Sequence, residues 1–192
     1  MANTYPYALL LRGINVGGHR KVPMADLRTL LTELGHGGVR SHLQSGNAVF
    51  TSPERDERRL ATDIERAIDG HFGFTVDCLV RGAAYLRAIV DDCPFPAAEI
   101  EGRQLHVTYF SERVDPERLA GIDTAARLPE EFRLGDRALY LYAPDGLGRS
   151  KLAQQLARPG LFKGVVATSR NWNTVVKLAE MTADAAAGDD RG

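Results

Sequence analysis

The sequence of 192 residues contains only two cysteines, Cys78 and Cys93. Two cysteines do not make the dense disulfide framework of a small secreted domain, so we expect two free thiols in a reducing compartment. No apolar run approaches the ~20 residues of a membrane helix, and the N-terminus lacks the basic region and long apolar segment of a signal peptide. These absences predict a cytoplasmic protein without a membrane segment.

Signals of metal binding and of common catalytic chemistry are also missing. The five histidines show no ligand spacing and no cluster with cysteine, so we predict neither a metal site nor a cofactor. There is no Gly-x-Ser-x-Gly elbow, and the acidic residues fall mainly on helical faces outside the motifs. The sequence therefore offers no evident general base or carboxylate pair, and whether the protein is an enzyme stays open.

Acidic residues are absent from three long stretches: residues 1–25, 34–53 and 146–179. These stretches hold ten lysines and arginines, although the net charge of the whole chain is −1. We expect them to assemble into one positive surface, which would attract an anionic ligand. The alternative is a chance distribution of the basic residues over several faces.

The remaining composition, 44% apolar and 26% charged residues, is typical of a globular protein, and strand and helix patterns alternate along both halves. Short units of this kind favour an α+β fold, with a ferredoxin-like N-terminal subdomain and a smaller α+β C-terminal subdomain. Pro94 and Pro96 mark the boundary between the two. We therefore expect subdomains over residues 1–96 and 97–182, followed by a frayed tail over residues 183–192.

A glycine-rich loop follows the first predicted strand, residues 7–12, and leads into a helix. Its glycines lack the spacing of a Walker A loop or of a dinucleotide fingerprint. Gly17 and Gly18 allow a ligand to approach the backbone closely, and a helix N-terminus favours negative charge. The loop thus predicts an anion-binding site, unless its glycines only shape a tight connection. The basic residues of the loop are Arg12, Arg20 and Lys21.

Four polar or small residues, Gln44 to Asn47, interrupt what otherwise resembles one strand over residues 39–50. Amide and hydroxyl groups hydrogen-bond a substrate well but abstract protons poorly. Ligand recognition is one interpretation of this segment. A structural bulge, in which Asn47 bonds the neighbouring backbone, is the equal alternative.

The last helix is predicted to begin near Thr168 and Ser169, with Trp172 as its core anchor. A helix start alone does not explain the polar residues around Trp172. A second basic helix start lies near Ser150, and Arg81 ends a strand as Arg12 does, which places Arg81 at the same rim. The further basic and amide residues assigned to the site are Arg81, Lys151, Arg170, Asn171 and Asn173.

Four segments together resemble the bacterial domain-of-unknown-function 1697 family: residues 11–18 (LRGINVGG), 43–47 (LQSGN), 94–96 (PFP) and 170–173 (RNWN). The resemblance covers residues 5–182 and implies a compact α+β protein with ferredoxin-like character. It implies no activity, because the family carries none that can be transferred. One departure is the pair Asp92-Cys93, where the family pattern leads us to expect an Asn before Pro-Phe-Pro.

These observations lead to one hypothesis and two alternatives. The hypothesis is a protein that binds a phosphorylated or other anionic ligand, such as a nucleotide or a nucleic-acid segment, in a basic cleft. The alternatives are a phosphate-ester or acyl-phosphate hydrolase that uses Arg and Asn electrostatics, and a protein-interaction domain. No membrane partner is expected, and the oligomeric state is open. The predicted ligand contacts are Arg12, Asn15, Gly17, Gly18, Lys21, Gln44, Ser45, Asn47, Arg81, Lys151, Arg170, Asn171 and Asn173.

Overall fold

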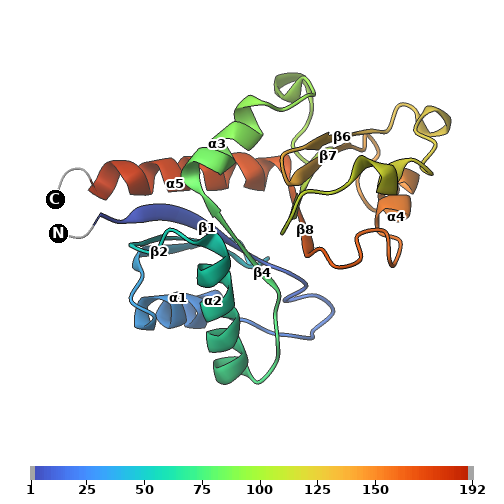
Figure 1. The fold of residues 1–192 in the computed structure, drawn as a ribbon. Helices are drawn as coiled ribbons and strands as arrows, with labels where there is room; N and C mark the ends of the chain where they lie inside the picture. Colours follow the sequence, from blue (N-terminus) through green and yellow to red (C-terminus); the bar gives the residue numbers. More distant parts are fainter. Residues whose placement is uncertain (1–2, 190–192) are drawn as a thin grey trace. The chain divides into compact units, whose positions relative to one another are not determined.

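The computed structural model describes residues 3–189 of the chain. Among these residues the chain forms two compact units, each built on its own four-stranded antiparallel sheet (Figure 1). Unit 1 comprises residues 3–88 and 177–189, and unit 2 comprises residues 89–176. The division therefore falls inside a helix rather than at Pro94 and Pro96, and the C-terminal segment belongs to unit 1.

Unit 1 follows the element order β-α-β-β-α-β. Its elements are β1 (Tyr5–Leu11), α1 (Met24–Glu33), β2 (Gly37–His42), β3 (Asn47–Ser52), α2 (Glu57–Phe72), β4 (Cys78–Gly82) and the first part of α3 (Ala83–Asp91). The strands lie in the order β2-β3-β1-β4, and all neighbours are antiparallel.

The core of unit 1 lies between its sheet and the helices α1 and α2, which Figure 1 shows on the same face. Alternation along β1 directs Leu9 and Leu11 to this face. Helix α2 begins where the Asp56 carboxylate accepts hydrogen bonds from two backbone N–H groups. It ends at Gly73, whose φ of 76° suits glycine. The helical residues buried in this core include Leu27, Leu31, Leu60, Ile64 and Ile68.

Unit 2 repeats the layout of strands with less helix. Its strands lie in the order β6-β7-β5-β8, again all antiparallel, and its core packs the sheet against α4. The elements are η1 (Ala97–Glu99), β5 (Leu105–Phe110), η2 (Pro116–Leu119), η3 (Ala125–Arg127), β6 (Glu131–Gly135), β7 (Ala138–Tyr142), α4 (Lys151–Leu156), β8 (Ala167–Asn171) and α5 (Trp172–Asp189), the last of which continues into unit 1.

The two sheets share one plan, strand for strand. The first strand of each unit lies between the third and fourth, and a helix directly follows each fourth strand. Hydrogen bonds agree as well: the Leu11 N–H donates to the Gly46 carbonyl and the Phe110 N–H to the Arg137 carbonyl, both at 2.8 Å. Gly46 and Arg137 both have positive φ, of 79° and 49°. The same plan therefore occurs twice in one chain.

The units differ most where β1 and β5 end. Unit 1 has a long connection over residues 12–23 and a turn over residues 43–46, whereas the matching hairpin of unit 2 turns at Asp136 and Arg137 alone. Since unit 2 builds the same sheet with the shorter turn, the sheet does not require the longer turn between β2 and β3.

Three local expectations differ from the structure. Residues 39–50 form parts of two strands joined by a turn, because the polar segment reverses the chain rather than bulging it. Thr168 and Ser169 lie in β8, which pairs with β5 and fills the fourth place in the sheet. Helix α5 continues through residues 183–189, since this alanine-rich segment has high helix propensity; residues 190–192 of the expected tail lie outside the described residues.

The prediction of an α+β fold is confirmed by these two sheets and their helices.

Both faces of the unit 1 sheet are covered. Arg40 of β2 donates a hydrogen bond of 2.8 Å from Nη2 to the Met181 carbonyl of α5, within unit 1. In the described part of the chain, no helix has the length and apolar character to cross a membrane.

Candidate functional site

The glycine-rich loop of unit 1 is held in shape by Asn15. Its Nδ2 donates to the carbonyls of Val22, at 3.1 Å, and Gln44, at 2.6 Å, while its Oδ1 accepts from the Val22 N–H at 2.9 Å. Asn15 has a φ of 56°, a conformation that asparagine tolerates better than most residues. One amide side chain therefore closes residues 15–22 into a loop and ties that loop to the turn between β2 and β3. We call these two segments, residues 12–22 and 42–47, the paired loops.

The turn between β2 and β3 is equally fixed. Asn47 is fully buried, and its Nδ2 donates to the His42 carbonyl at 3.1 Å and to the Ser45 Oγ at 2.9 Å. A Cβ at Gly46 would lie 2.7 Å from the Leu11 Cβ, so only glycine fits there. The amide of Asn47 thus shapes the turn, while Gln44 and Ser45 lie at its exposed surface.

The basic side chains of the paired loops lie at the surface. Arg12 forms an ion pair of 3.0 Å with Asp77, and about half of each side chain is exposed, so the pair contributes at most about 1 kcal/mol. Arg20 and Lys21 are exposed, as are Gly17 and Gly18. The backbone N–H groups of Gly17 and Gly18 donate to no other residue that the structure describes. A ligand at this surface would therefore meet cations and backbone donors together.

Two aliphatic side chains protrude from the same paired loops. Val16 is 69% exposed in the glycine-rich loop, and Leu43 is 58% exposed in the turn. Leu43 also has a φ of 57°, which a leucine adopts at a cost of about 1 kcal/mol or more. An exposed leucine in a strained backbone conformation adds nothing to a core, and such positions often have a binding role.

Arg81 does not share the rim of Arg12. Strands β1 and β4 are antiparallel, and Arg81 lies opposite Ala8, whereas Arg12 follows the other end of β1. The Arg81 side chain is buried: its Nη1 donates to the Val80 carbonyl at 2.7 Å and pairs with Glu57 at 3.4 Å. Arg81 is thus placed in the interior of unit 1.

Arg170 occupies the matching position in unit 2. It lies opposite Val107 on β8, and its buried Nη1 donates to the carbonyl of the preceding residue, Ser169, and to the Thr168 hydroxyl, both at 2.8 Å. Burial lowers the pKa of Arg170 to about 10, so it remains charged at neutral pH. Each fourth strand therefore carries one buried arginine that bonds the carbonyl before it.

The N-terminus of α4, which the sequence predicted as a basic helix start, binds a carboxylate of the protein itself. Ser150 caps α4 by accepting from the Ala153 N–H, and the Glu130 carboxylate accepts from the Ser150 hydroxyl and the Leu152 N–H, both at 2.8 Å. Lys151 is exposed, and its backbone N–H donates to Glu130 at 3.3 Å. The protein's own carboxylate thus fills the place that an external anion would take.

The two asparagines beside Trp172 have different surroundings. The Asn171 Oδ1 accepts a hydrogen bond of 3.0 Å from the Thr174 N–H and so begins α5. Asn173 is exposed and lies so close to Gly102 that a Cβ at Gly102 would clash with its side chain.

Of the predicted contacts, the eight from Arg12 to Asn47 come together in the paired loops. Arg81 lies elsewhere in unit 1, and the other four belong to unit 2.

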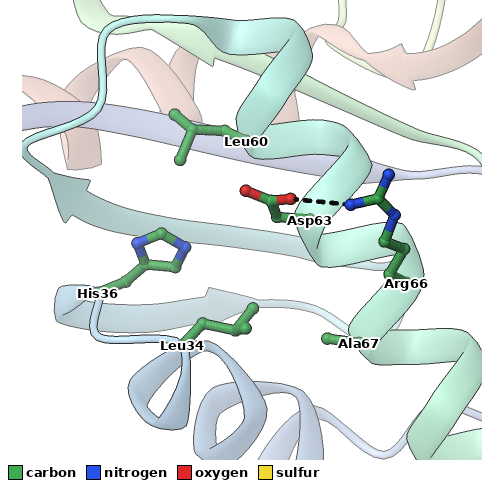
Figure 2. Close-up of a pocket in the computed structure, with 6 residues that line it drawn as sticks. All are labelled: Leu34, His36, Leu60, Asp63, Arg66 and Ala67. Carbon is green, nitrogen blue, oxygen red and sulfur yellow. Dashed lines mark ion pairs between the residues drawn. The ribbon is translucent and has the colours of Figure 1, made fainter.

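A pocket of about 430 Å³, which the sequence did not indicate, opens in unit 1 between the end of α1 and one face of α2 (Figure 2). We call it the α1–α2 pocket. The i, i+3, i+6, i+7 spacing of its α2 residues places them on one helical face, as in any amphipathic helix, so the spacing alone gives no signal. The lining residues are Leu34, His36, Leu60, Asp63, Arg66 and Ala67.

The thiols are not suited to nucleophilic chemistry in this structure. Burial raises the pKa of Cys78 far above its ordinary value, with Glu65 and Asp77 acting in the same direction. Burial also raises the pKa of Cys93. Both groups are free thiols, which remain protonated at neutral pH. Among the residues described, no three His, Cys, Asp or Glu side chains form a group that could hold a metal ion.

The two units, each with an antiparallel sheet, make this an α+β protein. Comparison with known proteins then identifies its family. The chain belongs to the family described as protein of unknown function (DUF1697), whose model matches residues 5–140. The matched region includes the paired loops and ends before Arg170. The comparison with curated proteins finds no match.

The fold is similar to that of a solved structure, the conserved bacterial protein SP0830 from Streptococcus pneumoniae. The TM-score is 0.73 and the sequence identity is 26%, and the similarity covers 94% of this chain and 99% of that chain. Both units therefore have counterparts in a solved structure, which supports the compact α+β fold.

Proposed function

We propose that this protein binds a phosphate-bearing ligand, a nucleotide or a nucleic-acid segment, at the paired loops of unit 1. The observation that supports it is the arrangement of the loop itself. Arg12, Arg20 and Lys21 are exposed on a segment that Asn15 holds closed with three hydrogen bonds. A cationic surface of fixed shape loses little conformational freedom when an anion binds to it.

Each group in the paired loops has a defined role in this proposal. The side chains of Arg20 and Lys21 contact phosphate oxygens, and Arg12 joins them by exchanging its exposed pair with Asp77 for the ligand. Gly17 and Gly18 allow close approach to their backbone N–H groups. Gln44 and Ser45 lie at the exposed turn, where they can hydrogen-bond the remainder of the ligand. Asn15 and Asn47 shape the site from within.

The repeated plan of the chain supports a functional role for the paired loops. Unit 2 forms the same sheet with a two-residue hairpin turn, so formation of the sheet does not explain the extra length of the turn between β2 and β3 in unit 1. Segments that a fold does not need, and that carry exposed glycine and charge, are typical of binding loops. The hydrolase alternative relies on Arg and Asn electrostatics, and the Asn47 amide is fully buried and bonded within the turn.

A protein-interaction domain is the second candidate function, and one observation favours it. Val16 and Leu43 are exposed apolar residues beside the basic ones, and a small phosphate ligand has no need of them. A macromolecule bound at the paired loops would cover both. The size of the ligand therefore separates the two candidates.

The test is a titration of the full chain with ADP, with inorganic phosphate and with a labelled single-stranded oligonucleotide. We expect saturable binding of ADP or of the oligonucleotide that weakens as salt is added. The double variant Arg20→Ala/Lys21→Ala should bind about tenfold more weakly, because it removes two of the three exposed cations. Its melting temperature should match that of the wild type, since both side chains are exposed.

Arg113→Ala is the matched control, because Arg113 is an exposed arginine of unit 2 that pairs with Asp136 at the surface. It should bind as the wild type does. Binding that the double variant leaves unchanged would contradict the assignment of the site. If none of the three probes binds, the phosphate-ligand proposal is wrong, and variants of Val16 and Leu43 then test the interaction domain.

A further inference from the structure

The α1–α2 pocket has three apolar walls and one aromatic wall. Leu34, Leu60 and Ala67 line it with aliphatic carbon, as Figure 2 shows. The His36 ring forms the aromatic wall and packs on the buried Phe50, with 4.5 Å between ring centroids. Burial lowers the pKa of His36, with Asp63 acting in the opposite direction, so the imidazole is neutral at pH 7. These walls suit a hydrocarbon group.

Two opposite charges lie along the remaining edge of the pocket. The Asp63 Oδ1 is 3.6 Å from the Arg66 Nη1, and the Asp63 Oδ2 is 4.0 Å from the Arg59 Nε. In Figure 2 the carboxylate of Asp63 lies nearer the space beside Leu60 and His36, and the guanidinium of Arg66 lies beyond it. Arg66 is 77% exposed, so its pair with Asp63 is weak and can exchange for ligand groups.

We propose that this pocket binds a free α-amino acid with an apolar side chain. The ammonium group lies against the Asp63 carboxylate, and the carboxylate lies against the Arg66 guanidinium. The side chain rests on Leu34, Leu60 and Ala67, away from water. An α-amino acid carries a positive ammonium group next to a negative carboxylate. Asp63 and Arg66 present the complementary pair, a negative group next to a positive one.

Charge and size both separate this ligand from its analogues. A simple amine of the same skeleton offers no carboxylate to Arg66, and a simple acid offers no ammonium group to Asp63, so each loses one of two contacts. The volume of about 430 Å³ lies near the lower end of small-molecule pockets and fits a single amino acid. The pocket shares no residue with the paired loops, so this inference does not rest on the proposed function.

The test is a titration of the full chain with L-phenylalanine, in which calorimetry or ligand-observed NMR measures the binding. Phenethylamine and 3-phenylpropionate are the matched probes, because each keeps the ring and one of the two charges. We expect saturable binding of L-phenylalanine and at least about tenfold weaker binding of each analogue.

Variants on α2 assign the two charges separately. Asp63→Asn and Arg66→Gln should each weaken L-phenylalanine binding about tenfold. Asp63→Asn should not weaken the binding of 3-phenylpropionate, since that probe has no ammonium group and the change frees Arg66 from its ion pair. Asp69→Asn and Arg58→Gln are the controls on the same helix, because neither residue lines the pocket, and both should bind as the wild type does. Melting temperatures verify that all four variants fold.

Three results would overturn the inference. The first is no saturable binding of L-phenylalanine by the wild-type chain. The second is phenethylamine or 3-phenylpropionate binding as tightly as the amino acid, which would identify a site for a singly charged ligand. The third is unchanged binding in folded Asp63→Asn and Arg66→Gln chains. The Arg20→Ala/Lys21→Ala chain should bind L-phenylalanine normally, so failure at the paired loops is distinguishable from failure here.

Discussion

Two glycines of the paired loops have nearly the same backbone conformation but different surroundings. Gly46 has a φ of 79° and Gly18 a φ of 78°. A Cβ at Gly46 would lie 2.7 Å from the Leu11 Cβ and 2.8 Å from the Ile14 Cδ1, whereas a Cβ at Gly18 would have no atom within 4 Å. Gly18→Ala therefore meets backbone strain only, of about 1 kcal/mol. Gly46→Ala meets steric overlap in the core as well, and we expect it to cost about 3 kcal/mol.

Urea denaturation of the two variants measures the difference, because both share the cost of a positive φ. Equal losses of unfolding free energy would show that the contact with Leu11 and Ile14 is relaxed at no cost. Gly18→Ala also serves the ligand titrations. Its fold should be intact, so any loss of ADP or oligonucleotide binding in that variant reflects close approach of a ligand to the loop.

At the residue scale, the sequence does not separate a ligand contact from a structural hydrogen bond. Asn15 and Asn47 were predicted as ligand contacts because amides hydrogen-bond ligands well. The same property lets them bond backbone carbonyls, and both do so here. The choice depends on which carbonyls lie within hydrogen-bond distance in the folded chain. That distance is a property of tertiary structure, and a single sequence does not contain it.

Helix α4 is an element whose beginning depends on a distant side chain. It has six residues and buries Leu152 and Leu156 against the unit 2 core. The Glu130 carboxylate accepts hydrogen bonds from the Ser150 hydroxyl and from the N–H groups of Lys151 and Leu152. A helix this short has little stability of its own. We expect Glu130→Ala to lower the unfolding free energy by about 2 kcal/mol, since it leaves these donors without their acceptor.

Chemical denaturation of Glu130→Ala and of its neighbour Glu131→Ala tests this role. Glu131 pairs with Arg133 at 2.7 Å, and both side chains are at least one third exposed, so its loss should cost about 0.5 kcal/mol. Similar effects of the two variants would contradict the capping role of Glu130. The sequence located this helix start through Ser150 but assigned its free donors to an external anion, because residues 130 and 150 are remote along the chain.

At the scale of the whole molecule, the repeated plan was invisible in the sequence. Matching positions are filled by different residues, such as Gly46 and Arg137 in the two hairpins, and the helix α1 of unit 1 has only 3₁₀ turns as its counterpart. A strand order of β2-β3-β1-β4 requires only a suitable alternation of apolar residues, which many sequences satisfy. The α+β class was therefore predictable, whereas the correspondence between halves needed the strand register.

The stability of the whole molecule should fall in mild acid. Burial lowers the pKa of His36, His42 and His106, with Lys177 adding to the effect at His42. Below the ordinary histidine pKa of about 6.5, the unfolded chain binds protons that the folded chain does not, so acid favours unfolding. We expect the unfolding free energy to decrease as the pH falls from about 7.5 to about 5.5, before most carboxylates titrate.

His106 is the residue to test, because burial alone shifts its pKa, whereas Asp63 also acts on the pKa of His36 and Lys177 on that of His42. It lies on β5 opposite Leu141 and Asn171, neither of which titrates, and its Nδ1 has no hydrogen-bond partner in the described residues. His106→Gln removes the titrating group while keeping a polar side chain. The variant should lose less stability than the wild type between the two pH values in urea denaturation. An unchanged pH dependence would mean that His106 takes up its proton equally well in the folded chain.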